Sequence, residues 1–331
     1  MMVIMFPVLT TSTILCFMMN SWVSIWVMLE MNTLAYCSMM KSSKQSSKKM
    51  NENSMKYFII QSISSSILIM SMMTTKMLAK MMTFTATMSV ISILIKMAAS
   101  PFQQWFVKMV KEIEWKMSTI LMTWQKLAPV YLTLFLSKIM MMPFIMVTAY
   151  MGMILQMNKN FMMQIMGLSS VFNLSWMLLA MMNSTKTMIY FSLLYWSSVM
   201  MMMMLIAKSK MTKISKESAG SMKKLIYFIF MMNLAGIPPF PSFLAKLMIL
   251  NEFMELKMKL ITTLILTASS LNLFIYMRMM NMEMVKNFEK KQMSKSKMLK
   301  MTNMLMMMTM MPMMMWYFYS KRLNESTILM E

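Results

Sequence analysis

Three charged residues lie inside or beside apolar segments, and their positions suit them to acid–base chemistry. Glu30 lies halfway along residues 21–40, and Lys126 lies in the middle of another apolar segment. Lys246 follows the helix-breaking residues 236–239 (GIPP). A charge at the centre of a bilayer costs roughly 2.5–3.5 kcal/mol on insertion scales, so it is retained where a partner, water or a function offsets that cost. Isolated acids and bases in such positions are what a proton path requires, and we predict that these three residues form one.

The composition places these charges in a membrane. The chain has 331 residues, of which 58% are hydrophobic, and its mean hydropathy is +0.57. Its apolar runs are about 20 residues long, which is the length of a bilayer-spanning helix. Residues 1–19 lack a basic start and a small-residue cleavage site, so they are interpreted as the first span rather than a signal peptide. The predicted fold is all-α, a polytopic transmembrane helical bundle forming a single transmembrane domain over residues 1–331.

About eleven spans are predicted, with broken helices among them. The short apolar stretch 241–256 follows two prolines and carries charges, so it is interpreted as part of a broken or re-entrant helix rather than a complete span. The predicted spans are 2–19, 21–40, 55–75, 81–99, 117–137, 140–157, 160–180, 187–207, 224–240, 259–280 and 300–319.

The lysines predict a topology. The net charge is +22, and most lysines fall in loops 41–56, 208–224 and 281–300, which lie on one side of this arrangement. The positive-inside rule then puts the N-terminus on the matrix or cytoplasmic side and the C-terminus opposite. The charge is thereby explained without a nucleic-acid partner. The amphipathic stretch 101–116 is predicted to be an interfacial helix or loop on the basic side.

Methionine, histidine and cysteine give little sign of metal chemistry. There are 66 Met residues and no His, which indicates the mutational bias of an A+T-rich organellar gene rather than a copper site, because such a site would pair Met with His or Cys. Cys16 and Cys37 are far apart in sequence and are interpreted as small apolar fillers. No metal site or cofactor is expected on this chain.

Each buried charge has a structural alternative. Glu30 has no charged residue one helical turn ahead, so its partner must come from another helix. A proton-accepting role is favoured over the alternative, which is a neutral acid whose hydrogen bond joins two helices. Lys126 precedes Pro129, which frees a backbone carbonyl and favours local water, against the alternative that the lysine extends to an interface. For Lys246 these two readings are evenly balanced.

Several segments together resemble the family of mitochondrial NADH dehydrogenase subunit 2 of animals, one of the antiporter-like membrane subunits of respiratory complex I. The matches run in order over nearly the whole chain, although no single one would be specific. The segment around Lys126 matches the family's T-W-Q-K-L-A-P stretch outright. The matching segments are 26–32 (WVMLEMN), 101–105 (PFQQW), 123–129 (TWQKLAP), 169–176 (SSVFNLSW), 234–240 (LAGIPPF) and 243–246 (FLAK).

The resemblance implies a proton path made of a helix Glu, a Lys on a broken helix, a second central Lys, and a Lys on another broken helix. Glu30, Lys126 and Lys246 match three of these. The second central Lys is interpreted as replaced by Gln164, and a neighbouring family His by Asn173; neither side chain titrates. Either water aligned by Gln164, Asn173 and Ser170 takes its place, or another lysine does.

The implied function is that of a core membrane subunit that translocates protons across the mitochondrial inner membrane, with Glu30 pairing with Lys126 to hold its proton. NADH, FMN, iron–sulfur clusters and ubiquinone would bind partner subunits, and the neighbours would be other membrane-arm subunits and lipid, with cardiolipin a candidate at the basic loops. Two alternatives are a stand-alone cation/proton antiporter, which would work without partners, and a structural spacer of the membrane arm.

Overall fold

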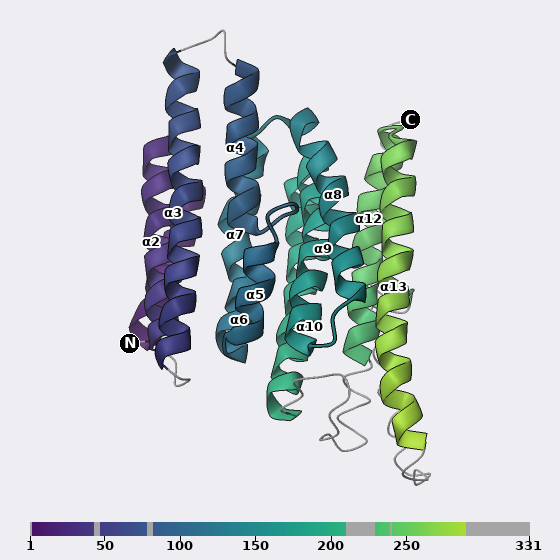
Figure 1. Cartoon of the computed structure of the whole chain (residues 1–331). Helices are drawn as coiled ribbons and strands as arrows, with labels where there is room; N and C mark the ends of the chain where they lie inside the picture. Colours follow the sequence, from purple (N-terminus) through teal and green to yellow (C-terminus); the bar gives the residue numbers. More distant parts are fainter. Residues whose placement is uncertain (1, 43–46, 78–81, 210–228, 239, 289–331) are drawn as a thin grey trace. The chain divides into compact units, whose positions relative to one another are not determined.

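The computed structural model describes residues 2–42, 47–77, 82–209, 229–238 and 240–288. The regular elements of these residues are helices, as the apolar runs predict. The chain divides into two compact units, Met1–Ser184 and Thr185–Glu331, each of which is described separately (Figure 1).

Unit 1 begins with four long helices that pack in chain order (Figure 1). The second begins where Ser21 accepts a hydrogen bond from the backbone N–H of Ser24 at 3.3 Å, a typical N-terminal cap. Apolar residues such as Ile4, Leu34 and Ile59 are exposed on the outside of these helices, as expected for surfaces that face lipid tails. The four helices are α1 (Met2–Met18), α2 (Trp22–Lys41), α3 (Ser47–Met77) and α4 (Met82–Met97).

A short helix and an interrupted helix follow α4. The sequence predicted one span over 117–137; the structure instead breaks this segment at Thr123. Pro129 cannot donate a hydrogen bond to the carbonyl one turn earlier, and a tight 3₁₀ turn fills the gap, in which the Lys126 N–H bonds the Thr123 carbonyl at 3.3 Å. The elements are α5 (Gln104–Glu112), α6 (Trp115–Met122), η2 (Trp124–Lys126), α7 (Leu127–Leu132) and η3 (Thr133–Phe135).

The helix α9 (Met162–Asn183) is the centre of unit 1, and α8 (Lys138–Met157) packs along it. Nearly every residue of α9 is buried. Glycines permit the close contacts: a Cβ on Gly152 of α8 would lie 3.2 Å from the Phe172 backbone nitrogen, and one on Gly167 would lie 3.5 Å from the Phe106 ring of α5. Hence α9 meets protein on all sides rather than lipid.

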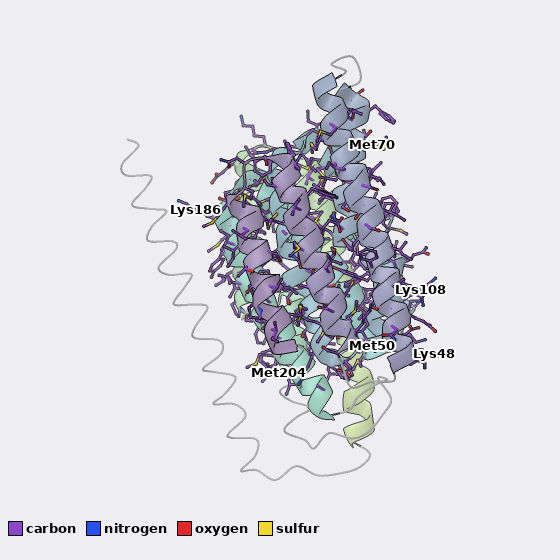
Figure 2. All side chains as sticks on the ribbon, turned by 90° about the vertical axis from the view of Figure 1, so that its left-hand side faces the viewer. Lys48, Met50, Met70, Lys108, Lys186 and Met204 are labelled. Atoms are coloured by element: carbon purple, nitrogen blue, oxygen red, sulfur yellow. The ribbon has the colours of Figure 1, made fainter. Side chains whose placement is uncertain are left out.

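The amphipathic stretch 101–116 forms helix α5, and its apolar face packs against α9. Its lysine Lys108 is exposed. Figure 2 shows Lys108 near the end of unit 1 that carries Lys48, and away from Met70. This arrangement agrees with a common basic end, while the position of that end relative to a membrane stays a prediction.

Unit 2 contains α10 (Thr185–Ser209), a helical segment at 229–235, α12 (Pro241–Glu255) and α13 (Lys259–Phe288). The predicted broken helix is confirmed, because the segment 229–235 ends at Gly236, where φ is +82°. A positive φ favours glycine, since other residues there suffer a clash with their own Cβ. Pro241 then starts α12 at a position where a missing N–H costs nothing.

Five of the described helices are long and apolar enough to cross a bilayer, and two shorter helices are also apolar. They account for most of the predicted spans in the described residues. The five are Lys48–Thr74, Lys138–Met157, Met162–Asn183, Thr185–Ala207 and Lys259–Met279, and the two are Ile4–Met18 and Thr83–Met97. The predicted span 300–319, most of loops 208–224 and 281–300, and part of span 224–240 lie outside the described residues.

Candidate proton-transfer site

Glu30 contacts a hydroxyl group from a neighbouring helix. Ser65 of α3 donates a hydrogen bond to Glu30 Oε1, and Thr33, one turn along α2, donates to Oε2 at 3.3 Å. The bond to Ser65 joins α2 to α3, as the structural alternative for Glu30 predicts, and the role of Glu30 in a proton path stays a prediction. Each of these hydroxyls also lies within hydrogen-bond distance of a backbone carbonyl, Ser65 of Ser62 at 2.9 Å and Thr33 of Glu30 at 2.8 Å, so the carboxyl group shares both donors.

Lys96 is a buried base that the sequence analysis did not single out. Its side chain is 6% exposed. Its Nζ donates to the Gln61 carbonyl at 3.4 Å, while the Gln61 amide donates to the Lys96 carbonyl at 3.3 Å. Lys96 also lies within electrostatic reach of Glu30. Lys96 at the end of α4 is thus a second buried lysine of unit 1 whose charge interacts with that of Glu30.

Lys126 is held at the helix break by oxygen atoms of α9. Its side chain is 2% exposed. Its Nζ donates to the Ser170 carbonyl at 2.8 Å and to the Ser170 hydroxyl at 2.9 Å, and lies 5.0 Å from the centre of the Phe106 ring. An aromatic face attracts a cation through its quadrupole. We call Lys126, Ser170 and Phe106 the Lys126 site.

The direct pairing of Glu30 with Lys126 is not the arrangement that the structure shows, because Lys126 bonds Ser170 instead. Of the three residues predicted to align water, Ser170 lies at Lys126. Asn173 is buried and its amide donates to the Ser169 carbonyl of its own helix at 3.0 Å. Gln164 is half-buried in the first turn of α9, about 9 Å along the helix axis from Ser170 at 1.5 Å per residue.

In unit 2, Lys246 folds back onto the end of the preceding helical segment. Its Nζ, on a side chain 5% exposed, donates to the Ala235 carbonyl at 3.1 Å. Ser242 donates to the Asn233 carbonyl and so closes the same break. The free carbonyls at a helix C-terminus carry a partial negative charge, which favours an ammonium group there. Lys246, Ala235 and Gly236 form what we call the Lys246 site.

These groups can donate and accept protons. An ammonium has three donors, and Lys126 has two of them on oxygen atoms, which leaves one N–H for a water or another acceptor. In the described ranges no group of three or more His, Cys, Asp or Glu side chains could hold a metal ion. Cys16 and Cys37 are buried and unpaired by disulfide.

Comparison with known proteins adds independent information. Residues 19–272 match the family model described as NADH:quinone oxidoreductase/Mrp antiporter, TM. The chain is 30% identical to NADH-ubiquinone oxidoreductase chain 2 of Locusta migratoria, over 82% of this chain and 81% of that one. It is 28% identical to the protein of the same name from Anopheles gambiae, over 82% of each.

Solved structures share the fold at low sequence identity. A chain of respiratory complex I from Thermus thermophilus superposes with a TM-score of 0.76 at 13% identity, over 84% of this chain and 69% of that one. A chain of the Mrp complex from Dietzia sp. DQ12-45-1b gives a TM-score of 0.69 at 14% identity, over 83% of this chain and 59% of that one. The antiporter-like fold predicted from the sequence is confirmed.

Proposed function

Because the chain belongs to the NADH-ubiquinone oxidoreductase chain 2 family, we propose that its buried charges carry protons across the mitochondrial inner membrane within complex I. The observation that carries this proposal is the Lys126 site, an ammonium group 2% exposed at a helix break. Burying a charged lysine within a membrane costs free energy, so such a residue is retained where it serves a function.

In unit 1 the proposed path contains an acid, Glu30, and two bases, Lys96 and Lys126. In this proposal a change in the charge of Glu30 acts on Lys96 through their electrostatic interaction. At an effective dielectric constant near 20, a pair of opposite unit charges contributes about 4 kcal/mol at a separation of about 4 Å and less at longer range. Moving one charge against 100 mV costs about 2.3 kcal/mol, which is of the same order as such a change in pairing.

Lys246 is the corresponding base of unit 2 in this proposal, and its site offers the carbonyl of Ala235 as an acceptor. Ser170 and Asn173 would order water on α9, and Gln164 would do so at the start of that helix. The partners are the other membrane-arm subunits and lipid, including cardiolipin at the basic loops. NADH oxidation and quinone reduction, with FMN, iron–sulfur clusters and ubiquinone, are assigned to those partner subunits.

The test is the substitution Lys126→Met in the intact complex, with Lys108→Met as a matched control because Lys108 is exposed. The complex is reconstituted in vesicles, and protons translocated per NADH oxidised are measured with a pH-sensitive dye. We expect Lys126→Met to assemble and to lower the proton yield, while Lys108→Met leaves it unchanged. A full yield in Lys126→Met would remove Lys126 from the mechanism, and a failure to assemble with a normal yield in the remaining complex would favour the structural spacer.

A further inference from the structure

Gln125, the residue before Lys126, connects the helices that hold Glu30 to the helix break that carries Lys126. Gln125 lies in the 3₁₀ turn η2, and both ends of its amide are used. Its Nε2 donates to Asn32 Oδ1 of α2 at 2.9 Å, and its Oε1 accepts from the Tyr57 hydroxyl of α3 at 3.2 Å. Since donor and acceptor each have a partner, the amide is fixed in one orientation.

The partners of Gln125 belong to the helices that hold Glu30. Asn32 is two residues after Glu30 on α2, and successive residues are about 100° apart at 3.6 residues per turn, so the two side chains leave the helix in nearly opposite directions. Glu30 contacts Ser65 of α3 on one side, and Asn32 contacts the broken helix on the other. Tyr57 itself lies within electrostatic reach of Glu30.

Further contacts hold α2 against α3 and against the segment that precedes the helix break. Tyr36 of α2 donates to the Met117 carbonyl of α6 at 2.9 Å, and its ring packs edge-on against Tyr57 at 4.9 Å. Within the turn the backbone N–H of Lys126 bonds the Thr123 carbonyl at 3.3 Å. The side chain of Gln125 adds bonds from this turn to α2 and α3.

We infer that Gln125 is a positioning residue that couples the Glu30 end of the site to Lys126, by tying the break in the helix to α2 and α3. A displacement of α2 against α3 would move Asn32 and Tyr57, and through Gln125 would alter the approach of the Lys126 ammonium to Ser170. This inference rests on the proposed function. To demonstrate coupling, substitutions in α2 and at Gln125 must change the same measured quantity, which here is the proton yield per NADH.

The experiment compares Gln125→Met with Gln156→Met in the intact complex. Met has nearly the shape of Gln but makes neither hydrogen bond. Gln156 of α8 is a matched control because it is fully buried and neither of its amide atoms has a hydrogen-bond partner. Protons translocated per NADH oxidised are measured in vesicles at equal amounts of assembled complex. We expect Gln125→Met to show at least half of the loss seen in Lys126→Met, and Gln156→Met to show the parental yield.

A double substitution tests whether Gln125 acts through α2. Asn32→Leu should lower the yield as Gln125→Met does, and the pair together should lower it no further than the stronger single variant, because both remove the same connection. If Gln125→Met does not assemble, Tyr57→Phe removes one of the two bonds and keeps the ring, and its proton yield should fall below that of Gln156→Met.

The outcomes separate the two claims. A parental yield per NADH in Gln125→Met, or additive losses in the double variant, would overturn the coupling while Lys126→Met still shows its loss. A reduced amount of complex with a normal yield per NADH would also overturn it, because that is the result of a purely structural role. A normal yield in Lys126→Met itself would instead refute the proposed function.

Discussion

The Lys126 site and the Lys246 site both hold a buried ammonium group, but the oxygen atoms that bind it come from different parts of the chain. Lys126 reaches across to α9 and bonds a residue 44 positions away in the chain, whereas Lys246 bonds a carbonyl only 11 positions before it, across the break in its own helix. Each lies beside an interruption of a helix that supplies non-helical backbone. One site therefore depends on the packing of helices and the other on the conformation of a turn.

The glycines at the two sites show what this difference implies. A Cβ at Gly236 would lie 2.7 Å from Lys246 Nζ, on a backbone whose φ of +82° already disfavours a side chain. A Cβ at Gly167, beside the Phe106 ring of the Lys126 site, would make ordinary van der Waals contacts of 3.4 Å and longer with Val110 and that ring. The turn-based site is hence sensitive to a single methyl group, while the packing-based site can absorb one.

The largest effect is expected from Gly236→Ala. The left-handed backbone costs about 1–2 kcal/mol for a residue with a Cβ, and the methyl group displaces the ammonium of Lys246 from Ala235. The proton yield per NADH should fall to near that of Lys246→Met, while Gly167→Ala stays close to the parental value. Equal behaviour of the two alanine variants would contradict the distinction between the sites.

A smaller effect is expected from Ser170→Ala. It removes one of two hydrogen bonds to the Lys126 ammonium, and a bond to a charged group contributes about 1.5–3 kcal/mol. The carbonyl bond at 2.8 Å remains, so the proton yield should fall partly rather than fully. Ser169→Ala is the control, since the hydroxyl of Ser169 donates only to the Met166 carbonyl of its own helix. A yield as low as that of Lys126→Met would show that the carbonyl alone cannot hold the lysine.

The smallest effect is expected from Ser242→Ala, which opens the break beside Lys246 without touching the lysine. A neutral hydrogen bond contributes about 0.5–1.5 kcal/mol. The temperature at which the complex loses NADH:ubiquinone activity should fall slightly more than in Ser192→Ala, whose hydroxyl bonds only within α10. If both variants lost activity at one temperature, the bond to Asn233 would contribute nothing to the turn.

Local features of the sequence predicted the helix break beside Lys246 better than the one beside Lys126. Gly236 and Pro238 both disfavour a continuous helix, so the interrupted helix could be anticipated from residues 236–241. The span 117–137 was predicted as one helix because hydropathy does not register a change of backbone hydrogen bonding. Because Pro129 has no N–H, a backbone carbonyl one turn earlier lacks its helical hydrogen bond, and the break occurs there.

Lys96 was missed for a different reason. It lies three residues from the predicted end of span 81–99, where hydropathy places the water interface. In the structure the chain turns back on itself there, and the residues from Met97 to Ser100 are all buried, so protein covers the end of α4. Lys96 is buried because the loop after α4 packs over the end of the helix, which hydropathy alone does not predict. The roles in proton transfer assigned to the predicted site residues stay predictions; these residues are Glu30, Lys126, Lys246, Gln164, Ser170 and Asn173.

The burial of α9 has a consequence for biogenesis. A helix with protein on every side cannot be added to a finished bundle, because its neighbours would already have closed the space. Its polar residues, among them Ser169, Asn173 and Ser175, must also avoid prolonged exposure to acyl chains. Insertion as a hairpin with α8, followed by closure of the earlier helices around the pair, is the order that meets both demands.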